Sequence, residues 1–403
     1  MEHVFKNNVK LIYTKNNSKL TSICIGLEAG AMSEKNKLGV AHATEHILYK
    51  GTKSKTEKQI NKELQSVFGF NNAMTNYPYA IYYGTLLQED FERGVSLLSD
   101  ILINPKLCID GFQEEMDVIK QELSEWDQDL EQFAEDKLFY NAFSGRLKHP
   151  IIGTKESLES ITIDDIKDFY SKNYNPQNTV ISVVSGLEPD CVINIIDKYF
   201  SSWSGKKQEK LKDKTEVLSK GYYIDKKADI NTDKIIMAFS INDLTDIELY
   251  SFRLFNEFFG EGVDSVLFDI LRTKTGLVYD VRTEIAIEKN IELYKIIFAA
   301  SAKKADIAIK DVKDEFDQIE RYLEVLDNKK IETLKKSLRI KHYIAKEKTI
   351  SIAKDITTFN IMFGNTQYYD DIEKNNYKIN GELILKTAKK VLKSSVIEKI
   401  TSI

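Results

Sequence analysis

The two halves of this 403-residue chain present the same order of sequence patterns, and this repetition restricts the fold more than any other feature. In the first half, a strand-like apolar run at 21–30 precedes a stretch at 32–52 whose apolar residues recur at helical spacing. In the second half, a strand-like run at 233–242 precedes a helix-like stretch at 247–262 and further strand-like residues at 276–301. A period of roughly 200 residues predicts two copies of one α+β unit.

A polar stretch that is rich in lysine and poor in apolar residues separates the two halves and is the best candidate for a linker. We therefore predict an N-terminal domain over residues 1–203, a linker over 204–220 and a C-terminal domain over 221–403. All five prolines lie in the first copy, which indicates that the two copies have diverged.

The charge and hydropathy of the chain exclude several classes of protein. The 62 acidic residues outnumber the 57 Lys and Arg residues, whereas a general nucleic-acid binder presents a basic surface. No run approaches the ~20 apolar residues that cross a bilayer, and the first residues lack the apolar stretch of a signal peptide. Three scattered cysteines fit buried thiols in a reducing compartment better than disulfides. We expect a cytoplasmic protein that binds neither nucleic acid nor membrane.

Residues 42–46 read His-Ala-Thr-Glu-His on a chain with only five histidines. One helical turn separates His42 from His46, so both imidazoles project from one face and can reach a single zinc ion about 2.0–2.1 Å away. Glu45 lies between them, where a carboxylate can accept a proton from an attacking water. The alternative is an ordinary amphipathic helix that happens to carry two imidazoles. The matching stretch of the second half has no histidine, so only the first copy can carry this chemistry.

A catalytic zinc ion needs a third protein ligand, and the remaining histidines are scattered. Carboxylates are abundant on one long acidic helix that we expect over residues 111–143, namely Glu114, Glu115, Asp117, Glu122, Glu125, Asp127 and Asp129. Helical spacing places three of these, Glu115, Glu122 and Glu125, near one stripe. The spacing alone does not choose among them.

The histidine–glutamate cluster, together with the acidic helix that follows it, resembles the M16 metallopeptidases, the family of pitrilysin, insulin-degrading enzyme and mitochondrial processing peptidase. The order His-x-x-Glu-His is the inverzincin signature, the reverse of the commoner His-Glu-x-x-His. The likeness covers almost the whole chain through the segments HATEHILYKGT, NAMT, EEMDVIKQELSEW, HPIIGT, YNPQNTVISVVSG and LFDILRTKTGLVYDV. It implies one zinc ion per chain as cofactor, with His42, His46 and Glu122 as ligands and Glu45 as general base. It also implies that Glu115 supports a ligand from behind.

The resemblance further implies where a peptide substrate binds. Asn72 and Ala73 would receive the substrate as an added β-strand through backbone groups. Without the family this stretch could equally be a core strand, although adjacent asparagines favour an edge. Arg272 and Tyr279 would clamp the substrate backbone or stabilise the oxyanion. Their spacing by itself carries no such assignment.

The family fold implies two homologous domains, each a mainly antiparallel sheet packed with helices, that together form half of a clamshell chamber. Family members of this length complete the chamber by pairing two chains, so we expect a homodimer, or a heterodimer with a related M16-type chain. The Lys-, Asn- and Ile-rich composition and the absence of a targeting segment at the N-terminus point to a bacterial cytoplasmic peptidase.

The leading hypothesis is a zinc-dependent endopeptidase that hydrolyses unfolded peptides, including leader or processing peptides, inside a dimeric chamber. The alternative is a non-catalytic or partner subunit of an M16-type heterodimer. The intact set of His42, Glu45, His46 and Glu122 argues against that alternative. A non-peptidase hydrolase that uses the same zinc ion is a third hypothesis.

Overall fold

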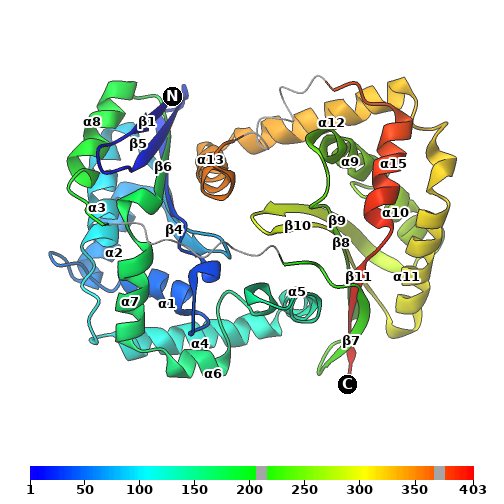
Figure 1. Cartoon of the computed structure of the whole chain (residues 1–403), viewed down its shortest axis with the longest axis horizontal. Coiled ribbons are helices and arrows are strands. Elements are labelled where there is room, and N and C mark those ends of the chain that lie inside the picture. The colour runs from blue at the N-terminus through cyan, green and yellow to red at the C-terminus, as the bar shows by residue number, and fades with distance from the viewer. Residues whose placement is uncertain (206–215, 367–376) are drawn as a thin grey trace. The chain divides into compact units, whose positions relative to one another are not determined.

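The computed structural model describes residues 1–205, 216–366 and 377–403, and the chain divides into two compact units. Each unit contains one sheet covered by helices (Figure 1). The predicted α+β class is therefore confirmed. Within the described part of the chain, no helix combines the length and the apolar character that crossing a membrane requires.

The sheet of the first unit has the strand order β1-β2-β6-β3-β5-β4. Neighbouring strands are antiparallel, except that β2 and β6 are parallel. Strand β4 lies at the edge of the sheet, which confirms the edge position that the adjacent asparagines favour. The strands are β1 (Glu2–Val4), β2 (Lys10–Lys15), β3 (Leu20–Leu27), β4 (Phe68–Thr75), β5 (Ala80–Leu87) and β6 (Thr179–Ser185).

The helices of the first unit come mainly from the first half of the chain. They are α1 (Val40–Leu48), α2 (Glu57–Val67), α3 (Phe91–Ile103), most of α4 (Phe112–Gln128), α6 (Lys155–Ser160), α7 (Ile163–Asn173), α8 (Pro189–Phe200) and α13 (Thr349–Phe363). Short 3-10 turns are η1 (Ala31–Ser33), η2 (Gln88–Asp90) and η4 (Pro176–Asn178).

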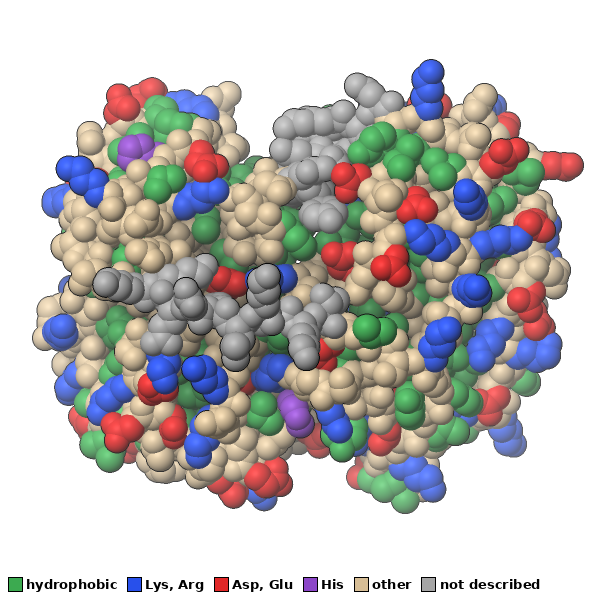
Figure 2. All heavy atoms as spheres, viewed as in Figure 1, with side chains coloured by type: hydrophobic (Ala, Val, Ile, Leu, Met, Phe, Trp, Pro, Cys, Tyr) green, Lys and Arg blue, Asp and Glu red, His purple; other side chains and the backbone are tan. Residues whose placement is uncertain are grey.

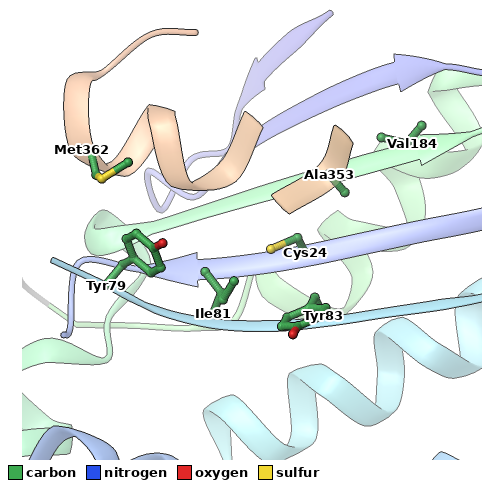
Figure 3. Packing of buried hydrophobic residues seen from close by; sticks show 7 residues of the cluster. All are labelled: Cys24, Tyr79, Ile81, Tyr83, Val184, Ala353 and Met362. Carbon is green, nitrogen blue, oxygen red and sulfur yellow. The ribbon is translucent and has the colours of Figure 1, made fainter. Parts of the chain in front are cut away.

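Helix α13 covers one face of this sheet, although it belongs to the second half of the chain. Figure 3 shows how side chains of the sheet pack against Ala353 and Met362 of α13. These side chains come from β3, β5 and β6 and from the residue just before β5, and they belong to Cys24, Tyr79, Ile81, Tyr83 and Val184. Gly26 allows the helix to approach closely, because a Cβ atom there would lie 2.4 Å from a methyl group of Thr357.

The second unit repeats this architecture. Its sheet has the order β7-β11-β8-β10-β9, with β7 and β11 parallel and the other pairs antiparallel. The strands are β7 (Gly221–Lys227), β8 (Asp233–Ser240), β9 (Val278–Glu288), β10 (Ile291–Ala300) and β11 (Val396–Ser402). Read in chain order, this is the order β2-β6-β3-β5-β4 of the first sheet, so the predicted duplication is confirmed.

Helices also cover the sheet of the second unit (Figure 1). They are α5 (Leu130–Ala142), α9 (Asp246–Phe259), α10 (Val266–Phe268), α11 (Ala302–Asp317), most of α12 (Asn328–Lys346) and α15 (Gly381–Leu392). The second unit also contains the π-helical turn η5 (Asp269–Lys274) and two 3-10 turns, η3 (Arg146–Lys148) and η6 (Ile319–Tyr322).

The two halves of the chain exchange helices between the units. Helix α13 packs on β3, β5 and β6, whereas α5, from the first half, packs on β7, β8 and β11. Each compact unit combines segments from both halves of the chain. The division into units therefore does not test the domain limits predicted from the sequence, which stay a prediction. Residues 206–215 of the predicted linker lie outside the described residues.

Two expectations from the sequence are wrong in detail. The acidic stretch at 111–143 forms two helices, because the side chain of Asp129 accepts hydrogen bonds from the backbone N–H groups of Glu131 and Gln132 and starts α5. Only Cys24 is a buried thiol, whereas Cys191 is exposed. On the face shown in Figure 2, Lys and Arg side chains lie among Asp and Glu side chains.

Candidate metal centre

Helix α1 presents two imidazoles on one face. The helix begins after Gly39, whose φ of 85° is in the left-handed region. Every residue of α1 except His46 is buried, so the helix is fixed against its surroundings. The rings of His42 and His46 lie edge to face with their centroids 4.6 Å apart. The predicted one-turn spacing thus brings the two rings together.

Helix α4 supplies the third side chain. The Oε2 atom of Glu122 lies 3.8 Å from Nε2 of His42 and 3.5 Å from Nε2 of His46. A tetrahedral zinc ion with bonds of about 2.0–2.1 Å holds its ligands about 3.3 Å apart, so this donor set fits zinc after small side-chain movements. Within the described residues, these three side chains form the only group of three or more potential ligands whose donor atoms lie within 4.8 Å of one another.

The environment of His42 favours the form that binds a metal. Burial, together with the neighbouring His46, lowers the pKa of His42 to about 3. Neutral imidazole is the ligating form, so His42 offers a lone pair at neutral pH. Its Nδ1 atom is buried and has no hydrogen-bond partner in the described part of the chain.

A series of polar contacts holds His46 through Nδ1, the ring nitrogen that does not face Glu122. Nδ1 of His46 lies 2.8 Å from Oε1 of Glu115, which leaves Nε2 to face Glu122. Burial acts against the charged form of His46, but this hydrogen bond and the nearby carboxylates raise its pKa. The other oxygen of Glu115 lies 3.2 Å from the ammonium group of Lys50, which also contacts Glu57 at 2.9 Å. The hydrogen bond to His46 is the main cause that lowers the pKa of Glu115.

We expect Glu115→Gln to weaken zinc binding by about 10- to 100-fold, the usual cost of removing such a supporting partner. The amide can still accept a hydrogen bond from His46, but it loses the negative charge that polarises the ring and pairs with Lys50. Competition with a chelator measures the change. Glu114→Gln, which alters an exposed residue on the same helical turn, should bind zinc like the wild type. Equal affinity of the two variants would contradict the supporting role of Glu115.

Glu45 lies beside this group and outside its donor set. It is 8% exposed, and its Oε2 accepts a hydrogen bond of 2.5 Å from the hydroxyl of Thr75. Burial raises the pKa of Glu45 to about 7, while the bond from Thr75 acts in the opposite direction. A carboxyl group whose pKa lies near neutrality can accept a proton and release it again, as a general base must.

The predicted substrate-binding residues fall in both units. Asn72 is exposed on the edge strand β4, and its side chain accepts a hydrogen bond from the backbone N–H of Ala73. Arg272 and Tyr279 lie in the second unit, where the guanidinium carbon is 4.9 Å from the centroid of the tyrosine ring. Tyr279 is 83% exposed. The approach of this pair to the zinc ligands stays a prediction.

Sequence reasoning missed Thr75 and Lys50. Both lie inside the quoted segments NAMT and HATEHILYKGT. Lys50 follows His46 by four residues, a spacing that already indicates the same side of a helical turn. No sequence signal pairs Thr75 with Glu45, because their contact depends on how α1 packs against β4.

Two family models match successive parts of the chain. Residues 10–155 match the model described as insulinase, peptidase family M16, and residues 160–338 match the model described as the peptidase M16 inactive domain. The first match contains every candidate zinc ligand, and the second covers Arg272 and Tyr279. This agrees with the absence of a histidine from the stretch of the second half that matches residues 42–46.

Individual relatives extend the likeness along the chain. An uncharacterized zinc protease of Rickettsia bellii is 27% identical over 400 residues, which cover 97% of this chain and 94% of the relative. The mitochondrial-processing peptidase subunit beta of Saccharomyces cerevisiae is 32% identical over 190 residues, 47% of this chain and 41% of the relative.

The solved structures that match include a protease from Helicobacter pylori, with a TM-score of 0.89 and 16% identity. The match covers 100% of this chain and 99% of that one. A peptidase M16 inactive domain from Pseudomonas fluorescens has a TM-score of 0.87 and 17% identity, and the match covers 100% of this chain and 98% of that one. At these identities the structural likeness establishes the fold.

Proposed function

Because the chain belongs to peptidase family M16, we propose that it is a zinc-dependent endopeptidase. The observation that carries this proposal is the convergence of His42, His46 and Glu122 beside a buried glutamate that is not a ligand. A non-catalytic subunit has no need for this complete set. The curated relatives named zinc proteases support the same class of activity.

Zinc, when bound by these three side chains, would polarise the scissile carbonyl and make a water molecule more acidic. Glu45 takes the proton of the attacking water, since its carboxylate lies next to the ligands without being one of them. Later the same group returns the proton to the leaving amine, as microscopic reversibility permits for a single acid–base group. Glu115 holds Nδ1 of His46 and thereby directs Nε2 towards the ion.

The proposed substrates are unfolded peptides, because the edge of β4 offers backbone groups to an added strand. Leader or processing peptides are of this kind. Arg272 and Tyr279 are proposed to hold the substrate backbone or the oxyanion. We further propose that the chain acts in the cytoplasm of a bacterium and pairs with a second copy, or with a related M16-type chain, to enclose the substrate.

The test is chelator-sensitive hydrolysis by the purified protein. Elemental analysis should give one zinc ion per chain, and a library of quenched peptides should be cut. A chelator should abolish cleavage, and added zinc should restore it. Mass spectrometry of the products would then define the cleavage sites.

Two outcomes would replace the proposal. Protein that carries no zinc and cuts no peptide, even after zinc is added, would favour a non-catalytic subunit of a heterodimer. Zinc-dependent hydrolysis of small esters without peptide cleavage would favour a different hydrolase.

A further inference from the structure

The last residue of β4 contacts the proposed general base. Thr75 is 8% exposed, and its hydroxyl donates the 2.5 Å hydrogen bond to Oε2 of Glu45. This is the one side-chain hydrogen bond that Thr75 makes within the described residues, and Glu45 receives no other. Within the described residues the second oxygen of the carboxylate, Oε1, accepts no hydrogen bond, so it is the oxygen available to accept a proton.

The backbone around Thr75 is held firmly. Thr75 pairs with Ala80 at the end of the β4–β5 ladder. The carbonyl groups of the next two residues accept backbone hydrogen bonds from Ala31 and Met32, at 3.0 and 2.8 Å. A hydroxyl on such a support has a fixed position, whereas a free glutamate side chain rotates about three bonds.

We propose that Thr75 is a positioning residue for the general base, an inference that rests on the proposed function. Its hydroxyl fixes one carboxylate oxygen of Glu45 and so aims the other at the water that attacks the peptide. Orientation of this kind is catalytically valuable, because an error of about 1 Å in the position of a reacting group can cost about 10²-fold in rate.

The position of Thr75 in the chain also links the base to the substrate. The residue lies three positions after Asn72, on the strand whose edge is proposed to receive the peptide. The hydroxyl itself contacts the base and not the edge of β4 that is proposed to receive the peptide. The effect of losing the hydroxyl is therefore expected in kcat rather than in KM.

Thr75→Val tests this inference, because valine keeps the branched shape and removes the hydroxyl. We expect kcat to fall about 10- to 100-fold, with KM within about twofold of the wild type and one zinc ion still bound. Thr75→Ser should recover most of the loss. Should the valine variant fail to fold, Thr75→Ser and Thr75→Ala give the same comparison, because both lack the methyl group and differ only in the hydroxyl.

A matched control removes a hydroxyl from the neighbouring strand. Thr85→Val breaks the 2.7 Å bond between Thr85 and Ser22, away from the proposed base, and should leave kcat within about twofold of the wild type. Unchanged kcat in Thr75→Val, or a loss confined to KM, would overturn the positioning role. A loss that Thr75→Ser does not recover would overturn it too.

A stability measurement on the metal-free protein tests the contact without relying on activity. The free energies of unfolding of Thr75→Val, Glu45→Ala and the double variant form a double-mutant cycle, because alanine, unlike glutamine, cannot accept the hydrogen bond from Thr75. We expect non-additive shifts, and strict additivity would contradict the coupling. A wild type that hydrolyses nothing would instead overturn the proposed function, whatever the cycle gives.

Discussion

Glu45→Gln is expected to retain one zinc ion per chain and to lower kcat by about 10²- to 10⁴-fold, the contribution typical of a general base. The amide has the shape of the carboxylate but cannot accept the proton of the attacking water. Zinc remains, because the donor atoms come from His42, His46 and Glu122. Steady-state kinetics on a quenched peptide, together with elemental analysis of the same sample, measure both effects.

The control for this prediction is Glu125→Gln. Glu125 is exposed on α4, one turn beyond Glu122, and its loss removes one carboxylate near the site without touching the proposed base. It should keep near-normal kcat. If Glu45→Gln cut peptides at the wild-type rate, another group would have to accept the proton.

His46→Ala is expected to lose both the metal and the activity. Two protein ligands rather than three would remain, and Glu115 would lose the ring that it orients. Dialysis followed by elemental analysis should show far less than one zinc ion per chain, and peptide cleavage should fall to background. Circular dichroism checks that the variant is folded.

The matched control is His3→Ala, which removes a histidine on β1, outside the ligand group. It should keep one zinc ion after the same dialysis. Stoichiometric zinc in dialysed His46→Ala would show that the ligand set is wrong.

The sequence alone predicted the duplication, because strand and helix patterns recur in the same order and the sheets repeat one strand order. It could not predict that α5 and α13 exchange units. The sequence pattern of an amphipathic helix shows that one face is buried, but it does not show which sheet packs against that face. The exchange becomes visible only in the packing of Ala353 and Met362 against the first sheet (Figure 3).

The candidate site was predictable to the extent that it is local. His42, Glu45 and His46 follow from spacing on one helix. Glu122 required the resemblance to a family, because several carboxylates on the acidic stretch satisfy helical geometry equally well. Thr75 lies 30 residues from its partner, and a threonine hydroxyl has too many possible acceptors for spacing to select one.

Because α13 belongs to the second half of the chain, the ribosome completes the first sheet well before it synthesises the helix that covers this sheet. The last strand of the first sheet ends at Ser185, whereas α13 begins at Thr349. Because a ribosome adds about 5–20 residues per second, α13 is synthesised on the order of ten seconds after the sheet that it covers. Every proposed metal ligand has been translated long before then. A chain that stops short of α13 would carry the whole ligand set and still expose the apolar face of the sheet, which makes such fragments prone to aggregation.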